Sequence, residues 1–238
     1  MNIPKQRLIF HIDVNSAFLS WESVYRLEKN PQDTDLRTIA CAVGGDSSTR
    51  HGIILAKSTL AKKQGVTTGE PISQALRKCP DLVIVPSRFD FYIQCSRKMM
   101  TLLEEYTPDH EKFSIDETFL DMTDTIHLFG PPLSTANIIR NRIRDQLGFT
   151  VNIGISSNKL LAKMASDFEK PDKCHTLFPQ EIAEKMWHLP VRTLFFTGRA
   201  AAQKLNQLGI YTIGDLAGSD PNFLQAHLNS QGITLWNY

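Results

Sequence analysis

Apolar residues along the chain follow two spacings, which predict two kinds of element. Short apolar runs between turn residues predict buried strands, and apolar residues three and four positions apart predict helices with one buried face. Strands are predicted at residues 8–13, 36–43, 52–56, 82–86 and 150–156, with two more flanking residues 116 and 117. Helices are predicted at residues 16–27, 58–65, 71–78, 89–106, 134–147 and 158–168.

Turn and capping residues set several boundaries. Ser58 is a suitable N-cap and Gly65 a suitable helix terminator, so they bound one short helix. Residues 44–48, Gly-Gly-Asp-Ser-Ser, predict a turn. The elements follow one another as strand and helix, hairpin, then helix and strand, which is the order of a split βαβ arrangement. Residues 17–88 are then an insertion after its first strand.

The pattern changes after Pro171 to short helical pieces punctuated by glycines. Residues 205–216 predict two helices joined by a Gly-rich turn. Such a turn exposes backbone N–H groups near a helix N-terminus, which suits a phosphate group.

The amino-acid composition is that of an ordinary globular protein and says little more about the class of protein. The chain has 238 residues, enough for two or three small domains, and 42% hydrophobic with 21% charged residues is ordinary for a globular protein. No apolar run approaches the ~20 residues that span a membrane, and the N-terminus carries no signal-peptide pattern. The net charge of +1 neither supports nor excludes nucleic acid as a partner, but a general basic coat would give a higher charge, so any contact with DNA is expected to rely on placed amides and a few lysines.

The cysteines, His11 and the tryptophans are assigned no catalytic or metal-binding role. The four cysteines are far apart and form no CxxC, which predicts reduced thiols of a cytosolic protein rather than a zinc site or disulfides. His11 is interpreted as a satisfied core histidine. The three tryptophans, Trp21, Trp187 and Trp236, are predicted to anchor cores.

Three carboxylates at the edges of apolar runs are the most informative feature. Asp13 ends the run 8–13, and Asp116 and Glu117 lie within the run 113–120. An ionised group beside a core must be paired or coordinate a metal. Carboxylates from two strands suit Mg²⁺, and two such ions about 3.5–4 Å apart serve in-line displacement at phosphorus. The sequence therefore favours phosphoryl or nucleotidyl transfer.

Simpler interpretations exist for each residue alone. Asp13 could cap the following helix, and Asp116 with Glu117 could form an exposed hairpin turn. Lys62 and Lys63 could belong to a solvated helix face, which is the preferred interpretation of Lys63. Lys159 and Lys163 share a helix face, so at least one is expected to face the site.

Four segments resemble motifs of the Y-family (translesion) DNA polymerases, nearest the UmuC/DinB branch. They are residues 11–18 (HIDVNSAF), 114–117 (SIDE), 152–167 and the turn at 209–216 (GIYTIGDL). Their order and separations also match, and the resemblance covers essentially the whole chain. A nucleotidyl cyclase shares the carboxylates but lacks the helix-hairpin-helix that residues 200–216 predict.

The resemblance implies an α+β fold with three parts. A ferredoxin-like split βαβ palm takes residues 1–16 and 89–177, inserted small α/β fingers take 17–88, and an all-helical helix-hairpin-helix thumb takes 178–238. Family members carry a further little-finger domain that grips the template. The chain stops at Tyr238, where the linker to that domain is expected, so we expect a part of a longer polymerase.

The resemblance also implies a metal site. Asp13, Asp116 and Glu117 correspond to the family's ligands for two Mg²⁺ ions, with the Val14 carbonyl as an added ligand. Because all three acids are present, the alternative of a catalytically silent homologue that serves as a DNA-binding or scaffolding module is disfavoured.

Substrate contacts follow from the same resemblance. Phe18 corresponds to the steric gate that excludes a ribose 2′-hydroxyl, although by default it is a core residue. Lys62 and Lys170 correspond to triphosphate-binding positions. Thr59 stands where the family usually has Tyr, and Lys62 where it usually has Arg. Lysine cannot form the bidentate hydrogen bonds that arginine forms with a phosphate, so the triphosphate contact of Lys62 is expected to be weaker or rearranged.

The implied activity is low-fidelity, lesion-bypass addition of a deoxynucleotide to a DNA primer 3′-end. The implied partners are primer–template DNA, dNTPs and a sliding clamp reached through a C-terminal region. The implied location is the bacterial cytoplasm, with no membrane partner.

Overall fold

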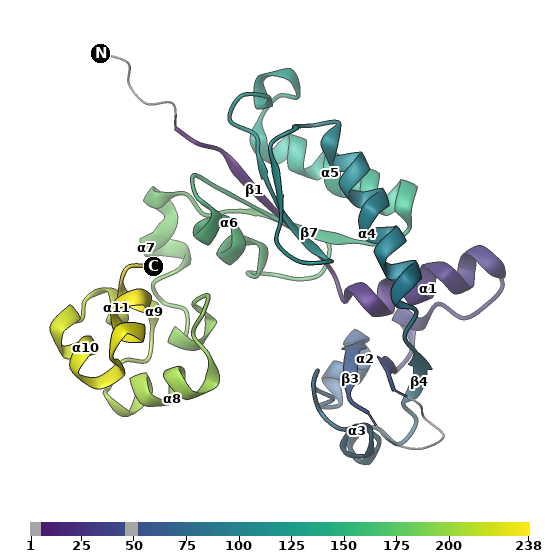
Figure 1. Ribbon diagram of the computed structural model, residues 1–238, viewed down its shortest axis with the longest axis horizontal. Helices are drawn as coiled ribbons and strands as arrows, with labels where there is room; N and C mark the ends of the chain where they lie inside the picture. The colour runs from purple at the N-terminus through teal and green to yellow at the C-terminus, as the bar shows by residue number, and fades with distance from the viewer. Residues whose placement is uncertain (1–5, 46–51) are drawn as a thin grey trace.

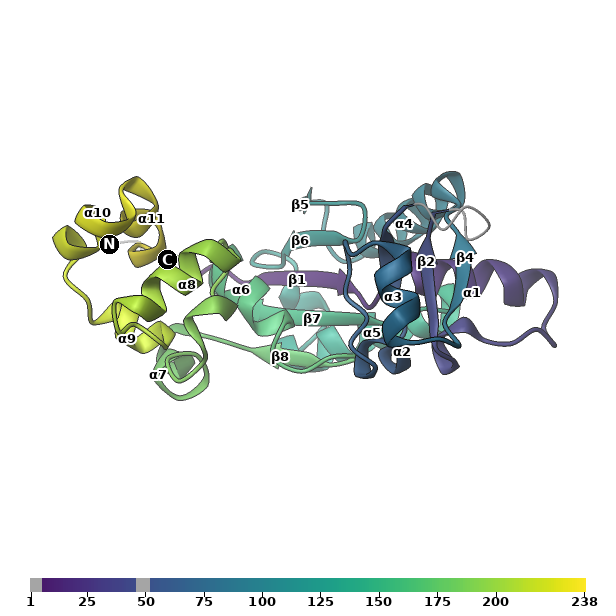
Figure 2. The ribbon, with the colours of Figure 1, turned by 90° about the horizontal axis from the view of Figure 1, so that it is seen from below.

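The computed structural model describes residues 6–45 and 52–238, which form two β-sheets and a C-terminal group of helices (Figures 1 and 2). The turn predicted at residues 44–48 lies mostly outside the described residues. No helix within the described ranges has both the length and the apolar character needed to cross a membrane. Figure 2 shows the larger sheet between the C-terminal helices and the smaller sheet.

The larger sheet has five strands in the order β5-β6-β1-β7-β8. Its central strand β1 runs antiparallel to β6 and β7, and β8 runs parallel to β7. The strands are β1 (Ile9–Val14), β5 (His110–Lys112), β6 (Glu117–Asp121), β7 (Val151–Ser156) and β8 (Cys174–Thr176). The predicted split βαβ order is confirmed. The sequence did not predict β8, because its three residues, Cys-His-Thr, show no apolar alternation.

Helices cover both faces of this sheet. They are α1 (Ala17–Lys29), α4 (Phe89–Glu104), α5 (Pro132–Leu147) and α6 (Lys159–Ser166). Phe10 and Ile12 of β1 pack in one core with residues of α1, α4 and α5, whereas Ile9 packs against Ala162 of α6. Because both faces are covered, every residue of β1 and β7 is buried.

Gly154 of β7 lies directly beneath α6, and we expect Gly154→Ala to destabilise the fold strongly. A Cβ there would lie 1.9 Å from the carbonyl oxygen of Ala162 and 2.4 Å from the backbone nitrogen of Ser166. Backbone atoms cannot rotate away, so the helix must shift, at about 3 kcal/mol or more. Denaturant titration measures the loss in unfolding free energy. Gly218→Ala is the control, because its nearest neighbour is 3.5 Å away; equal stabilities would contradict this packing.

The smaller sheet has the strand order β3-β2-β4, with β2 antiparallel to β3 and parallel to β4. Its elements are β2 (Cys41–Gly44), β3 (Ile54–Lys57), β4 (Val83–Pro86), α2 (Thr59–Lys63) and α3 (Ile72–Lys78). Ser58 caps α2 by accepting a hydrogen bond from the backbone N–H of Ala61, and Gly65 follows with a φ of 85°. Both predicted boundary residues are confirmed.

The strand predicted at residues 36–43 is wrong in its first half. Leu36–Thr38 is a 3-10 turn, and the strand begins only at Cys41. Asp35 causes the turn, since its carboxylate accepts hydrogen bonds from the backbone N–H and the guanidinium of Arg37.

The C-terminal region packs short helices around a core that also includes Leu161, Met164 and Ala165 of α6 and Leu177. They are α7 (Ile182–Lys185), α8 (Arg199–Gln207), α9 (Ile213–Ala217), α10 (Pro221–Leu228) and α11 (Ser230–Trp236). Short 3-10 helices lie at Pro179–Glu181 and Val191–Thr193 in this region, and another at Ile126–Leu128, between β6 and α5. Of the three tryptophans, Trp21 is fully buried as predicted, whereas Trp187 and Trp236 are 47% and 39% exposed, so their assignment as core anchors was wrong.

The turn between α8 and α9 has the predicted helix–turn–helix form, with Gly209 at a φ of 81°. Its N–H groups, however, are already engaged. The Asp215 carboxylate accepts from the N–H groups of Tyr211 and Thr212, and backbone carbonyls accept from residues 209, 210, 213 and 214. An acid on these amides would repel a phosphate, so the structure argues against the phosphate site inferred at this turn.

Candidate active site

A cavity of about 410 Å³ lies where β1 meets α1, next to the β3–α2 corner, the turn before β6 and the loop after α6. Seven of the eight site residues named from the sequence line it: Asp13, Val14, Phe18, Thr59, Lys62, Asp116 and Lys170. They come from positions up to 157 residues apart in the chain. The eighth residue, Glu117, lies outside the lining.

Asp13 lies near the end of β1, 8% exposed, and is the register partner of Glu117 on β6. The N–H of Val14 donates to the carbonyl of Asp116 at 3.0 Å, which fixes the turn before β6 against β1. The ammonium of Lys170 contacts the Asp13 carboxylate. Burial raises the pKa of Asp13 even though Lys170 opposes the shift.

Asp116 lies in the turn that precedes β6. Its carboxylate accepts a hydrogen bond of 2.6 Å from the Ser114 hydroxyl, and its side chain faces the same cavity as Asp13. The hairpin interpretation and the site interpretation of this residue are therefore compatible.

The Glu117 side chain points toward α6, and two side chains contact its carboxylate. His11 Nε2 lies 3.1 Å from its carboxylate, and the ammonium of Lys163 contacts the same oxygen. His11 is fully buried, with its Nδ1 2.8 Å from the Ser166 hydroxyl, so it is a satisfied histidine as predicted. Burial disfavours the charge on Glu117, but the His11 and Lys163 contacts outweigh it and lower its pKa to about 2.

Lys163 contacts the Glu117 carboxylate but does not line the cavity. Its i−4 neighbour Lys159 pairs instead with Glu111 on β5. Neither lysine lines the cavity, so the expectation that at least one of them faces the site stays a prediction, carried by the contact of Lys163 with Glu117.

The low pKa of Glu117 predicts an acid-sensitive contribution to stability. A carboxylate depressed from 4.5 to about 2 stabilises the fold above pH 4.5 and loses that contribution as the pH falls toward 2. Across this window we expect the unfolding free energy of the wild type to drop by about 2–3 kcal/mol more than that of Glu117→Gln. Denaturant titrations at several pH values test this, and parallel curves for the two proteins would contradict it.

The carboxylates fit a hard divalent cation by their chemistry. Oxygen donors suit Mg²⁺. The Lys170 ammonium contacts the Asp13 carboxylate, so a positive charge is already bound at this position. Within the part of the chain that the structure describes, no three His, Cys, Asp or Glu residues gather closely enough to hold one ion. Glu117 is engaged with His11 and Lys163. A complete ligand set therefore needs Glu117 to turn from α6 toward Asp13.

Phe18 is half-buried and lines the cavity. Its ring stacks on Tyr92 at 5.2 Å and 14°, and meets Phe89 edge-on at 5.6 Å. Tyr92 is in turn fixed by a hydrogen bond of 3.2 Å to the buried Glu22. One side of the ring is thus packed while another faces the cavity.

Two further residues of the cavity were missed by the sequence interpretation. Lys57 at the end of β3 and Thr68 both line it. The signal was present, since Lys57 is a cation that ends an apolar strand one residue before the Ser58 cap.

The loop that carries Lys170 is held by two buried amides that were also missed. The Asn152 amide donates to the carbonyls of Ser166 and Glu169, and Asn15 accepts from the N–H of Asp172 at 2.9 Å. Asn15 and Asn152 are also hydrogen-bonded to each other. A polar residue inside the apolar run 149–155 was the available signal for Asn152.

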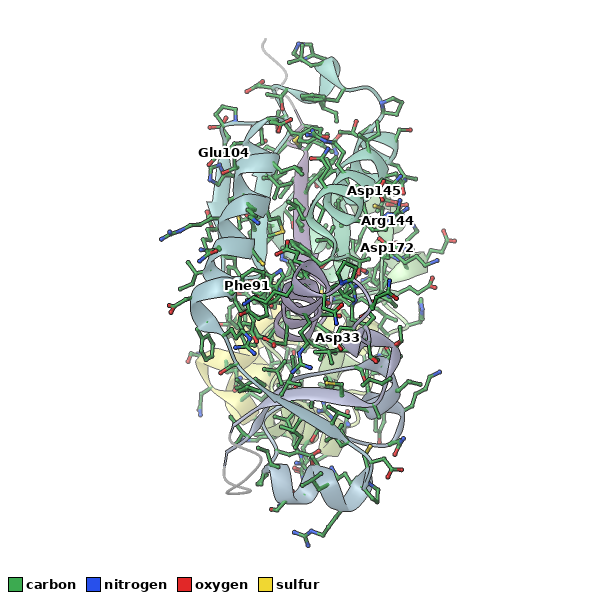
Figure 3. All side chains as sticks on the ribbon, turned by 90° about the vertical axis from the view of Figure 1, so that its right-hand side faces the viewer. Asp33, Phe91, Glu104, Arg144, Asp145 and Asp172 are labelled. Carbon is green, nitrogen blue, oxygen red and sulfur yellow. The ribbon has the colours of Figure 1, made fainter. Side chains whose placement is uncertain are left out.

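Helix α5 holds the other side of the same loop. Asp172 lies 3.4 Å from the guanidinium of Arg140 and 3.7 Å from that of Arg144. Figure 3 shows Arg144, Asp145 and Asp172 together at this edge of the molecule. The backbone on both sides of Lys170 is thereby fixed.

Known proteins are similar to this chain in sequence and in fold. The impB/mucB/samB family model matches residues 12–167. The DNA polymerase IV of Clostridium acetobutylicum is 51% identical over 98% of this chain and 58% of its own length, and that of Acetivibrio thermocellus is 40% identical over 98% and 57%. The solved structure of DinB from Sulfolobus solfataricus superimposes with a TM-score of 0.82 at 27% identity, over 96% of this chain and 65% of that one. An insertion ternary complex of Dbh DNA polymerase gives 0.83 at 28% identity, with the same coverage.

The fold is that of the catalytic cores of Y-family DNA polymerases, as expected from the sequence motifs. The chain belongs to the impB/mucB/samB family, the UmuC/DinB group. It spans a little over half the length of the DNA polymerase IV relatives it matches.

Proposed function

We propose that this chain is the catalytic core of a template-directed DNA polymerase of the lesion-bypass type. The observation that carries the proposal is the single cavity in which Asp13, Asp116, Phe18, Lys62 and Lys170 meet. Acids, cations and one aromatic ring in a common cavity are the set that a nucleoside triphosphate and a reacting hydroxyl require. The names of the relatives, DNA polymerase IV, agree with it.

The reaction is attack of a primer 3′-oxygen on the α-phosphorus of a dNTP. The new P–O bond forms as the bond to the bridging oxygen breaks, and pyrophosphate leaves. Asp13, Asp116 and Glu117, with the Val14 carbonyl, would hold two Mg²⁺ ions, which supply the charge that lowers the pKa of the 3′-hydroxyl and stabilises the leaving oxygen.

The remaining residues of the cavity bind and select the substrate. Lys62 and Lys170 hold the phosphate chain, and Thr59 of α2 borders it. Phe18 occupies the space of a ribose 2′-hydroxyl. Small side chains at Ala17 and Thr59 leave room at the nascent base pair, which favours damaged templates and low fidelity.

The hydrophobic clusters support a division into three functional parts. The palm is residues 1–16 and 89–177, the fingers 17–88 and the thumb 178–238, and each part contributes most residues of one cluster. Helix α1 joins two of them, since Trp21 packs in the palm cluster and Leu19 in a cluster with the smaller sheet. We further propose that the protein acts on primer–template DNA in the bacterial cytoplasm and that it binds a sliding clamp.

Primer extension tests the proposal directly. The purified chain, Mg²⁺, a labelled primer–template and single dNTPs should yield primer lengthened by the nucleotide complementary to the template. A cyclic nucleotide formed without primer would instead indicate a nucleotidyl cyclase. Absence of any product, from a chain that is folded and binds DNA, would indicate the silent homologue.

A further inference from the structure

Lys57 is a cation of the cavity that the resemblance does not account for. It ends β3, lines the cavity together with Leu55 and Ala56, and is only partly exposed. Its ammonium donates a hydrogen bond of 2.9 Å to the Thr68 hydroxyl, which is a neutral partner.

Among the described residues, the acid that interacts with Lys57 does not balance this charge. Glu70 interacts with Lys57 electrostatically, but its carboxylate is engaged by the ammonium of Lys78 and by the backbone N–H of Thr67 at 2.7 Å. Among residues 6–45 and 52–238, no carboxylate lies within ion-pair distance of Lys57 or Lys62. Lys170, by contrast, contacts both Asp13 and Asp167.

The positive charges of Lys57 and Lys62, which no carboxylate of the described residues pairs with, also repel each other. Burial and then the charge of Lys62 lower the pKa of Lys57. Both side chains face the same cavity from the smaller sheet and its first helix. Like charges held together in a partly buried site are relieved by an anion that contacts both, and the gain grows with the charge of that anion.

We propose that Lys57 binds the phosphate chain of the incoming nucleotide together with Lys62. The inference rests on the proposed function and extends it, because it assigns a phosphate contact to a residue of the smaller sheet. The Thr68 hydroxyl holds the ammonium at the cavity wall and is exchanged for a charged phosphate oxygen when the nucleotide enters. A hydrogen bond to a charged group is the stronger of the two.

Calorimetric titration with dATP, dADP and dAMP in Mg²⁺ tests the proposal. The variants are Lys57→Met and Lys57→Gln, the latter retaining a donor toward Thr68. The control is Lys63→Met, which removes an exposed lysine next to Lys62 that does not line the cavity. We expect both Lys57 variants to bind dATP about tenfold more weakly and dAMP almost unchanged, with Lys63→Met like the wild type.

Four results would overturn the proposal, one of them together with the proposed function. An equal loss for dATP and dAMP would place Lys57 at the base or sugar, and an equal loss in Lys63→Met would reveal a general field effect. Unchanged dATP affinity in both Lys57 variants would remove the contact altogether while leaving the proposed function intact. A wild type that binds none of the three nucleotides would instead overturn the proposed function, and this inference with it.

Discussion

Asp116→Ala is expected to abolish nucleotide addition and leave the fold intact. The side chain faces the cavity, and its hydrogen-bonding partners lie within its own turn, at Ser114. Loss of a carboxylate that holds catalytic charge costs on the order of 10³-fold or more in kcat. Single-turnover extension rates measure the loss of catalysis. The thermal unfolding midpoint of the same variant shows whether the fold is intact.

A matched control and a contrasting variant sharpen the test. Glu111→Ala removes an exposed carboxylate from the same hairpin, outside the cavity, and should extend primers normally. Glu117→Ala should lose both activity and stability, because it leaves His11 and Lys163 without their shared partner. Extension by Asp116→Ala at nearly the wild-type rate would refute the assignment of Asp116.

Phe18→Ala is expected to admit ribonucleotides. In the proposed site the ring excludes a 2′-hydroxyl by overlap, so its removal should raise the relative kcat/KM for rNTPs by ~10²–10⁴-fold, with a much smaller effect on dNTPs. The ring is also packed on Tyr92, so we expect a stability loss below the ~3–5 kcal/mol of a fully buried phenylalanine. Incorporation kinetics with both sugars, and the unfolding midpoint, are the measurements.

Phe89→Ala provides the comparison for Phe18. It removes a ring from the same aromatic cluster, 49% exposed, that does not line the cavity. Sugar discrimination should therefore stay unchanged in Phe89→Ala. A Phe18→Ala variant that also keeps its discrimination, with only a lowered midpoint, would leave Phe18 as a packing residue.

The sequence alone determined most elements and the chemical character of the site. Apolar runs and capping residues located strands and helices, since local spacing reflects one buried face. Asp13 and the pair Asp116–Glu117 stood out because ionised groups are costly beside a core. Motif order then assigned Phe18, Lys62 and Lys170 by resemblance.

Local patterns failed where a neighbouring polar residue or a distant segment overrides them. Asp35 turned part of an apolar run into a 3-10 turn, and the short strand β8 exists only because β7 offers it an edge. Trp187 and Trp236 are apolar in sequence yet partly exposed, because burial depends on which surfaces meet. The glycine-rich turn looked free for a phosphate until Asp215 was found on its amides.

Only the tertiary structure decided how the site residues meet. Sequence could not show that Glu117 turns to His11 and Lys163 while Asp116 faces the cavity, because neighbouring residues in and before a strand point to opposite faces. Nor could it show that Asn15 and Asn152 fix the loop of Lys170, or that Lys57 joins Lys62. These are relations between segments far apart in the chain, and packing of the sheets and helices alone sets them.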